Sequence, residues 1–201
     1  MGIFDKIFGD KNKDVNFNES SDLMSEEQFW SIIKLTYQNA NGDFDEQQNE
    51  LIKELKKISL QDIISFDNRF RQLRGQAYDW QLWGAIYIIH GGCGDDSFTD
   101  FRDWVIAQGK DFYYRTTSNP ETLVEIETEK IEVEWEGMGY IASSLFEELT
   151  GKEIPSTFKE NQEIKGNEWS EENNDELKIM FPKLWAKYAD NYIDKYKKNG
   201  I

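Results

Sequence analysis

The chain has 201 residues and a formal net charge of −16 at pH 7, from 39 Asp and Glu against 23 Lys and Arg. This length suits a single domain that buries about 70% of the surface of the unfolded chain. The 13 Phe, 9 Tyr and 7 Trp supply large side chains for a core, so the composition excludes a disordered chain. Its acidity makes nucleic acid and anionic membranes poor partners.

We infer the cellular compartment from the absence of disulfide pairs, of a signal peptide and of a membrane span in the sequence. The single cysteine excludes an internal disulfide. The opening MGIFDKIFG is short and charged, unlike a signal peptide, and no apolar run is long enough to span a bilayer. We therefore expect a cytoplasmic protein. Residues 1–22 are turn-rich and largely polar, which predicts a mobile tail and linker ahead of a single helical domain over residues 23–201.

Three amphipathic helices are predicted in the first part of this domain. Ser25 and Gln28 form a capping box for the first helix, a second begins near Phe44, and Ser59 with Asp62 opens the third. The apolar positions that we expect to face the core are Phe29, Ile33, Tyr37, Leu51, Leu55, Ile58, Ile63, Phe66, Phe70 and Leu73.

The third helix also carries the densest basic group of the chain on its outer side. This group consists of Arg69, Arg71 and Arg74. Arginine binds phosphate or a partner's carboxylate well because its guanidinium donates two parallel hydrogen bonds. In so acidic a chain, we expect these arginines to pair with carboxylates of the protein itself.

Residues 76–108 are predicted to form an apolar helix hairpin at the centre of a mainly α bundle. Residues 76–90 are apolar around most of a helix, so several neighbours must cover it. Gly91 follows, and glycine ends helices because it takes the left-handed conformation without steric cost. Asp95 or Asp96 is suited to cap the second helix. That helix has a buried face of Phe98, Phe101 and Val105.

The turn GGCGDD, residues 91–96, joins these two helices next to the only histidine. A histidine in the last helical turn can bond a free carbonyl, and a lone cysteine is more often a small packed hydrophobe, so we favour a structural role. As the alternative, His90, Cys93, Asp95 and Asp96 are candidate catalytic residues or zinc ligands. No third orienting group is identifiable, and structural zinc normally takes paired Cys or His at close spacing.

Three aspartates share one side of the second hairpin helix. Asp96, Asp100 and Asp103 are candidate ligands for Mg²⁺ or Ca²⁺, which prefer oxygen. The same spacing is typical of the solvated face of an amphipathic helix, and we favour that interpretation. No cofactor is predicted.

The run LWGAIYIIHGGCGDDSFTDFRDWVIAQGKDFYY, with Phe29–Trp30 and NPETL at 119–123, resembles the uncharacterised bacterial family called domain of unknown function 4240. The resemblance covers residues 24–151 and rests on the pattern GGCxDDxFxxFRxWxIxxG. Gly94 departs from it, since serine follows the cysteine in the family. The resemblance implies no activity, substrate or cofactor. Residues 152–201 lie beyond it as a C-terminal helical extension.

The second half of the chain is strongly acidic. Between residues 121 and 178 there are seventeen Asp and Glu against five Lys, a net charge of −12. Near residues 131–135, apolar residues alternate with glutamates, which predicts at most one or two short half-buried strands. The outward residues of this alternation are Glu132, Glu134 and Glu136. A helix over 138–149, a polar connection over 152–168 and a helical region broken at Pro182 follow.

Two functions are compatible with these patterns. The preferred one is a non-enzymatic binding protein that engages a basic protein, because complementary fields favour such encounters. Glu132, Glu134 and Glu136 are the candidate partner-binding residues, and an immunity protein that neutralises a basic toxin is one version. The alternative is an enzyme or metal-dependent protein with its site at the GGCGDD turn. The sequence does not determine the oligomeric state.

Overall fold

The computed structural model describes residues 17–127, 133–171 and 174–189, and these are mainly helical, as predicted. The helices in chain order are α1 (Glu26–Ala40), α2 (Phe44–Leu55), α3 (Leu60–Gln76), α4 (Trp80–His90), α5 (Asp95–Ala107), α6 (Lys110–Ser118), η2 (Pro120–Glu125), η3 (Met138–Tyr140), α7 (Ile141–Thr150) and α8 (Asn174–Met180). Residues 182–189 are also helical. The described residues contain no strand, and residues 131–132 of the predicted strand lie outside them.

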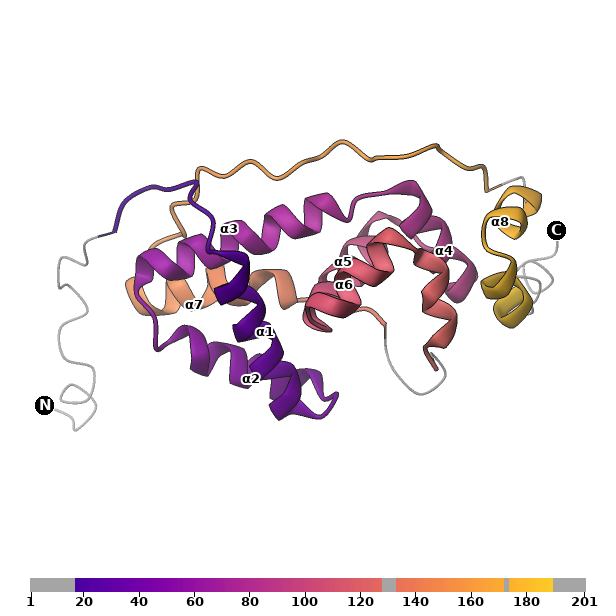
Figure 1. The fold of residues 1–201 in the computed structure, drawn as a ribbon. Coiled ribbons are helices and arrows are strands. Elements are labelled where there is room, and N and C mark those ends of the chain that lie inside the picture. Colours follow the sequence, from indigo (N-terminus) through magenta and orange to yellow (C-terminus); the bar gives the residue numbers. More distant parts are fainter. Residues whose placement is uncertain (1–16, 128–132, 172–173, 190–201) are drawn as a thin grey trace, which may run out of the picture.

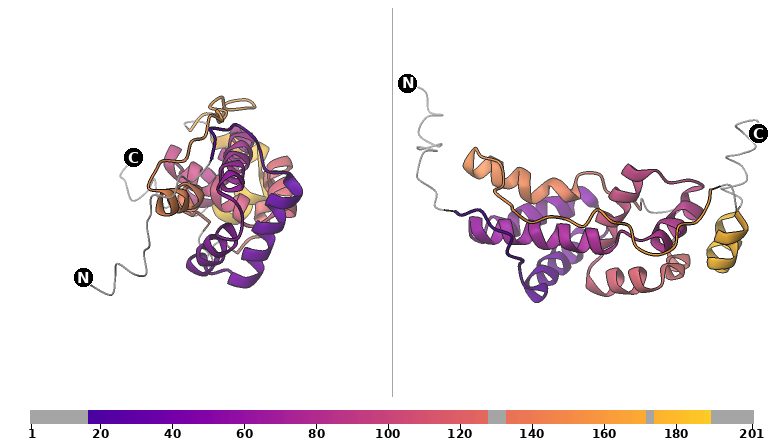
Figure 2. Two further views of the ribbon diagram at one scale, coloured as in Figure 1. Left: turned by 90° about the vertical axis from the view of Figure 1, so that its left-hand side faces the viewer. Right: turned by 90° about the horizontal axis from the view of Figure 1, so that it is seen from above.

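The helices form an elongated bundle along α3 (Figure 1). α1, α2 and α7 lie around the first half of α3, and α4, α5 and α6 lie towards the other end. After α7, the chain turns back. Residues 152–168, here called the return segment, run extended along α3 and reach α8 beyond α4 (Figures 1 and 2). Isolated β-bridges hold it near both ends, from Ser20 to Ser156 and from Asp79 to Lys165.

Several helix ends lie where the sequence predicts them. The Ser25 hydroxyl accepts from the amide of Gln28, and Ser59 and Asp62 form a reciprocal capping box. Gly91 ends α4 in the left-handed conformation, with φ 64°. Residues with short polar side chains and glycine thus set these boundaries through local hydrogen bonds and backbone sterics.

The predicted start of the central helix at residue 76 is wrong. Gln76 ends α3, and α4 begins at Trp80 after Asp79, whose side chain accepts from the amide of Gln81. The apolar spacing continues across the break through Tyr78, so periodicity alone did not reveal it. This turn exposes backbone groups to the return segment: Lys165 donates to the Tyr78 carbonyl and accepts from the amide of Trp80.

The described helices share one hydrophobic core. The predicted inward positions of α1 to α3 are at least partly buried, except for Tyr37, which is 38% exposed. The inner stripe of α1 instead passes through Thr36, whose hydroxyl donates to the carbonyl of Ile33. The buried stripe of the helix therefore continues three residues after Ile33, at Thr36. Tyr37, four residues after Ile33, lies outside this stripe.

The C-terminal extension covers α4, which is buried on most of its circumference. A Cβ atom on Gly84 would lie 3.0 Å from side-chain atoms of both Leu177 and Trp169, and 3.2 Å from Phe181. The absence of a side chain at Gly84 thus permits this close approach. At this point the extension is in close contact with α4.

The end of the predicted linker also packs against the domain. The Phe17 ring contacts Phe146 edge-on at 4.9 Å, and Asn68 donates to the carbonyl of Ser20. Residues 1–16 lie outside the described part of the chain. Among the described helices, none has the length and apolar character needed to cross a membrane.

Candidate functional site

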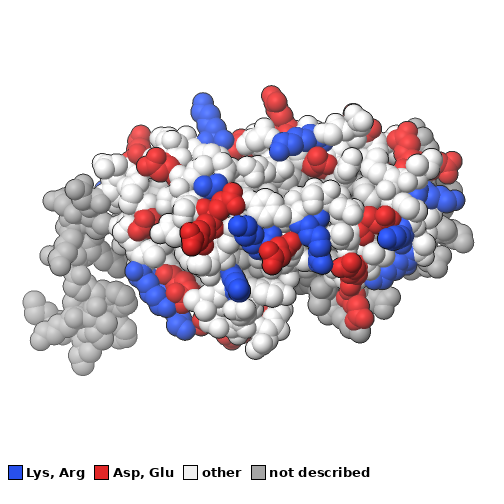
Figure 3. Space-filling model, in the orientation of Figure 1, with Lys and Arg blue, Asp and Glu red and all other residues white. Residues whose placement is uncertain are grey.

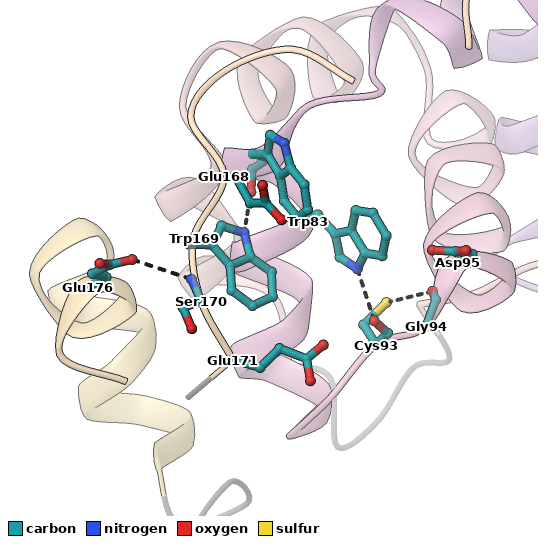
Figure 4. A pocket seen from close by; sticks show the side chains of 10 residues that line it. Trp83, Cys93, Gly94, Asp95, Glu168, Trp169, Ser170, Glu171 and Glu176 are labelled. Atoms are coloured by element: carbon teal, nitrogen blue, oxygen red, sulfur yellow. Dashed lines mark hydrogen bonds between the residues drawn. The ribbon is translucent and has the colours of Figure 1, made fainter. Parts of the chain in front are cut away.

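A cleft of about 700 Å³ lies near the predicted turn, between α4, the start of α5 and the C-terminal extension. Figure 4 shows Cys93 and Asp95 on one side, Glu168 and Trp169 on the other, and Glu171 pointing between them. The residues that line the cleft are Trp80, Trp83, Cys93, Gly94, Asp95, Glu168, Trp169, Ser170, Glu171 and Glu176.

Stacked aromatic rings position the wall that α4 contributes. Trp80 and Trp83 stack with centroids 5.3 Å apart, and Trp83 stacks on Phe98 of α5 at 4.8 Å. The spacing of three residues places the two indoles on one side of α4. The indole nitrogen of Trp83 also donates to the carbonyl of Cys93 over 2.9 Å. The helix and the following turn are therefore held together at the cleft.

Trp169 forms the opposite wall. It is only 5% exposed, and its ring lies 4.8 Å from that of Tyr87. Its indole nitrogen donates to the carbonyl of Trp80 over 2.8 Å. The Trp169 side chain is thus anchored to α4 by both packing and a hydrogen bond.

The rim of the cleft is acidic. Its carboxylates come from Asp95, Glu168, Glu171 and Glu176, and no Lys or Arg is among the described residues that line it. Glu176 accepts from the amide of Ser170 over 3.4 Å and so ties α8 to the rim. For Asp95 and Glu168, the described part of the chain provides no side-chain ion pair. The cleft is therefore suited chemically to a cation.

The turn itself differs from the prediction in its cap. Gly94 is the N-cap of α5 and provides no side-chain bond, while Asp95 and Asp96 occupy the first turn of the helix. In this position, the positive end of the helix dipole still stabilises the two carboxylates. Asp95 thus faces the cleft rather than serving as the predicted cap.

Among the described contacts, the side chains of His90 and Cys93 interact with different residues. His90 lies in the last turn of α4, as predicted, and its Nδ1 is 3.0 Å from Glu134 Oε1. Cys93 is buried, and its thiol donates to the carbonyl of Gly94 at 3.6 Å. Glu134, a predicted partner-binding residue, is thereby placed beside a predicted catalytic residue.

The three aspartates of α5 do not share one environment. Asp96 is exposed and Asp100 partly buried, but Asp103 is only 2% exposed, so the predicted solvated face is wrong for Asp103. No group of three potential metal ligands occurs within the described residues. The pKa of Asp100 is raised by partial burial and by the nearby charges of Glu136, Glu134 and Asp96. Acidic residues therefore also gather next to α5, outside the cleft.

Asp103 belongs to a buried set of three carboxylates and three arginines, here called the ion cluster. Its members are Asp67, Arg71, Arg74, Arg102, Asp103 and Glu160. Arg74 binds Glu160 of the return segment through two hydrogen bonds of 2.7 and 2.8 Å and lies 3.4 Å from Asp103. The expected pairing of the α3 arginines with the protein's own carboxylates is thus confirmed, since Arg69 also pairs with Glu26.

Burial dominates the electrostatics of the ion cluster. It raises the pKa of Asp67 to about 6 and that of Asp103 to about 7, against the opposing charge of nearby arginines. Burial also lowers the pKa of Arg102, whose guanidinium lies 4.6 Å from the Tyr78 ring centroid. Asp103 Oδ1 is buried without a hydrogen-bond partner among the described residues, but the other charged groups pair with one another, so we interpret the ion cluster as a structural element.

Figure 3 shows the distribution of charge on the face seen in Figure 1. Lys and Arg are interspersed with Asp and Glu across it, and neither sign covers the face alone. The excess of negative charge in the sequence therefore does not make this face a uniform acidic surface. The cleft differs because the described residues on its rim carry one sign only.

The sequence missed the C-terminal half of the cleft. Glu168, Trp169, Glu171 and Glu176 are separated from the turn by more than seventy residues, in a stretch read only as a polar connection and a helix. Trp169, a large aromatic residue within a polar run, was the available signal for a packing contact. Its partner was not predictable because the return segment has no periodicity that fixes its course.

Comparison with known protein families matches more than half of the chain. The model of the family described as "Protein of unknown function (DUF4240)" matches residues 24–148. No curated protein and no solved structure matches the chain. Five of the residues that line the cleft, Trp80 to Asp95, lie within the family match, and the other five lie in the extension beyond it.

Proposed function

The chain belongs to the family described as a protein of unknown function (DUF4240), and we propose its function from its own cleft. It is a non-enzymatic, cytoplasmic binding protein that engages a basic protein partner through the acidic surface around the turn between α4 and α5. An immunity protein that neutralises a basic toxin is one concrete version of this proposal.

The composition of the cleft carries the proposal. Four of its ten lining residues bear carboxylates, and none of the described ones is Lys or Arg. A cleft whose described lining residues carry only negative charge has a negative potential, which attracts a cationic partner and accelerates encounter. Elsewhere, as in the ion cluster, carboxylates are accompanied by arginines of the chain itself.

The acidic residues beside α5 support the same partner. Asp100 lies close enough to Asp96, Glu134 and Glu136 for their charges to raise its pKa. A basic surface brought near these groups would relieve that repulsion. Glu134 and Glu136 thus remain candidate partner-binding residues. Glu132, the third residue predicted from the sequence, lies outside the described residues.

The alternative function is an enzyme or metal-dependent protein at the GGCGDD turn. In that function a base within hydrogen-bonding reach would activate the Cys93 thiol. Among the described contacts, His90 Nδ1 lies 3.0 Å from Glu134 Oε1, and the Cys93 thiol donates to the carbonyl of Gly94. The binding proposal uses the same turn as a wall of the cleft.

Affinity capture from the native cells tests the proposal. Tagged wild-type protein, an Asp95→Lys/Glu168→Lys variant and a control Asp45→Lys/Glu147→Lys variant are each incubated with lysate. The control residues are exposed acids on α2 and α7, outside the cleft. Washes at about 0.1 M and about 1 M salt change the Debye length from about 10 Å to about 3 Å.

We expect wild type and control to retain the same basic protein at low salt. The cleft variant should lose it, and high salt should release it, because the attraction is electrostatic. Circular dichroism of the three proteins verifies that each is folded. Equal retention by wild type and the cleft variant, or a partner without basic character, would contradict the proposal.

A further inference from the structure

We infer that the cleft receives a lysine side chain, with its alkyl stem against the indoles and its primary ammonium at the carboxylates of Asp95 and Glu168. This inference rests on the proposed function and specifies the chemical group that the basic partner presents. Its support comes from the volume, the walls and the rim of the cleft.

The walls of the cleft are suited to an alkyl stem. Indoles of Trp80, Trp83 and Trp169 line a space of about 700 Å³, large enough for an extended side chain. Lysine buries its methylene groups along apolar surfaces while its charged end stays at a polar rim. A compact inorganic cation would leave this apolar wall unused.

The stacking of the rings argues against an aromatic cage for a methylated ammonium. A cation–π contact needs the cation over a ring face, within about 6 Å of the centroid. Both faces of Trp83 are already covered, by Trp80 at 5.3 Å and by Phe98 at 4.8 Å. Trp169 is almost fully buried and packs on Tyr87. Trp80 stacks on Trp83 and meets Trp169 edge-on at 5.9 Å, so the three indoles do not form an open cage. The carboxylates of the rim are therefore the main groups that would stabilise the positive charge.

The placement of those carboxylates favours an ammonium over a guanidinium. Asp95 belongs to the first turn of α5, and Glu168 lies at the end of the return segment on the other side of the cleft (Figure 4). Neither carries an ion pair with a described residue. Arginine binds best to two oxygens that lie side by side in a plane, whereas an ammonium directs three donors to separate partners.

Titration of the full-length protein with short capped peptides tests the inference. The four probes are Ac-Gly-X-Gly-amide peptides in which X is lysine, norleucine, trimethyl-lysine or arginine. Norleucine keeps the alkyl stem without the charge, and trimethyl-lysine keeps the charge without hydrogen-bond donors. The indole NH signals of Trp83 and Trp169 in ¹H–¹⁵N spectra report binding at the cleft itself.

We expect the lysine peptide to shift both indole signals and to bind more tightly than the other three. The Asp95→Asn/Glu168→Gln variant should bind it about fivefold more weakly, the size expected for two exposed ion pairs. The Asp45→Asn/Glu147→Gln variant, which changes the net charge equally outside the cleft, should match wild type. Equal binding of norleucine, or tighter binding of trimethyl-lysine or arginine, would overturn the inference.

The two proposals fail separately. If the basic partner is captured through the cleft but the lysine peptide does not bind, the inference is wrong and the proposed function stands. If the lysine peptide or the free diamine cadaverine binds at the cleft but no basic protein is captured, the ammonium site stands. The proposed function is then wrong, because the ligand is a small amine rather than a protein.

Discussion

The ion cluster on α3 and the cleft beside α4 contain similar numbers of carboxylates, but they differ in burial and in the presence of arginines. In the ion cluster, three carboxylates lie among three arginines, and Arg74 alone binds Glu160 twice and approaches Asp103. In the cleft, four carboxylates share the rim with no described Lys or Arg. The first set is buried and compensated, and the second is open and lacks a described cation.

This difference indicates where the protein needs an external cation. A buried charge is tolerated only when a partner of opposite sign replaces its hydration, so the arginines of the ion cluster are required by the fold itself. Carboxylates at an open rim keep their water and need no partner to be stable. Asp95 and Glu168, which have no ion pair with a described residue and lie beside the indoles of the cleft, are therefore available for binding, whereas the acids of the ion cluster are not.

The return segment contributes to both sets, although it lies beyond the family match. It supplies Glu160 to the ion cluster and Glu168 to the cleft. Arg74 lies within the matched region, and so do Trp80 and Trp83. The extension thus completes a charge balance and a cleft that the matched residues begin. The ion cluster fixes the middle of the return segment, and that contact helps to position the cleft.

Breaking the ion cluster should give the largest effect. Arg74→Met removes the cation that binds Glu160 and leaves that carboxylate, with a side chain only 9% exposed, beside Arg71 alone. We expect a loss of about 3 kcal/mol in the free energy of unfolding, because one member of a buried pair remains without its partner. Urea denaturation followed by circular dichroism measures this loss.

The matched control for that measurement is Arg115→Met. Arg115 pairs with Glu125 at 3.2 Å, but both side chains are more than half exposed. Its removal should cost no more than about 1 kcal/mol. If both variants lost the same free energy of unfolding, the ion cluster would stabilise the fold no more than an exposed ion pair. The proposed difference between the ion cluster and the cleft would then be wrong.

An intermediate effect is expected at the contact between α4 and the extension. Gly84→Val places a branched side chain where even a Cβ would lie 3.0 Å from Leu177 and Trp169. We expect a loss of about 2 kcal/mol from overpacking, together with displacement of Trp169. Urea denaturation measures the loss, and a shift of the Trp169 indole NH signal reports the displacement, because its bond to the Trp80 carbonyl is broken.

Gln81→Val supplies the control on the same helix. Gln81 is exposed, so this variant carries the helix-propensity cost of a β-branched residue without the steric conflict. Its stability should stay within about 0.5 kcal/mol of wild type, and the Trp169 signal should not move. If Gly84→Val behaved in the same way, the extension would not be closely packed on α4, and the cleft would need another wall.

Local signals explain what the sequence predicts well. The capping residues Ser25 and Ser59 and the terminating Gly91 act through bonds and sterics within a few residues, so their roles follow from the sequence. The mainly α fold follows from periodicity for the same reason. The pairing of the α3 arginines was predictable from the composition alone, although Glu160 was not identifiable as the partner.

Long-range packing explains what the sequence did not predict. Asp96 and Asp103 do share one side of α5, but the far end of that side packs against α3 and the return segment, which buries Asp103. The cleft depends on Trp169 meeting Trp80 across 89 positions. An extended segment without periodicity gives no indication of where it lies, so half of the candidate site was invisible in the sequence.

Neutralising the rim of the cleft should have the smallest effect on stability. Asp95→Asn/Glu168→Gln removes two carboxylates that have no ion pair with a described residue, so relief of repulsion should offset the lost dipole interaction of Asp95. We expect the free energy of unfolding to change by no more than about 0.5 kcal/mol, at an unchanged dependence on urea concentration. If the free energy of unfolding fell by about 2 kcal/mol or more, Asp95 and Glu168 would stabilise the fold, as the acids of the ion cluster do. An equally stable variant that binds the lysine peptide more weakly would instead separate the two regions, because loss of charge would then destabilise the protein at the ion cluster and weaken only ligand binding at the cleft.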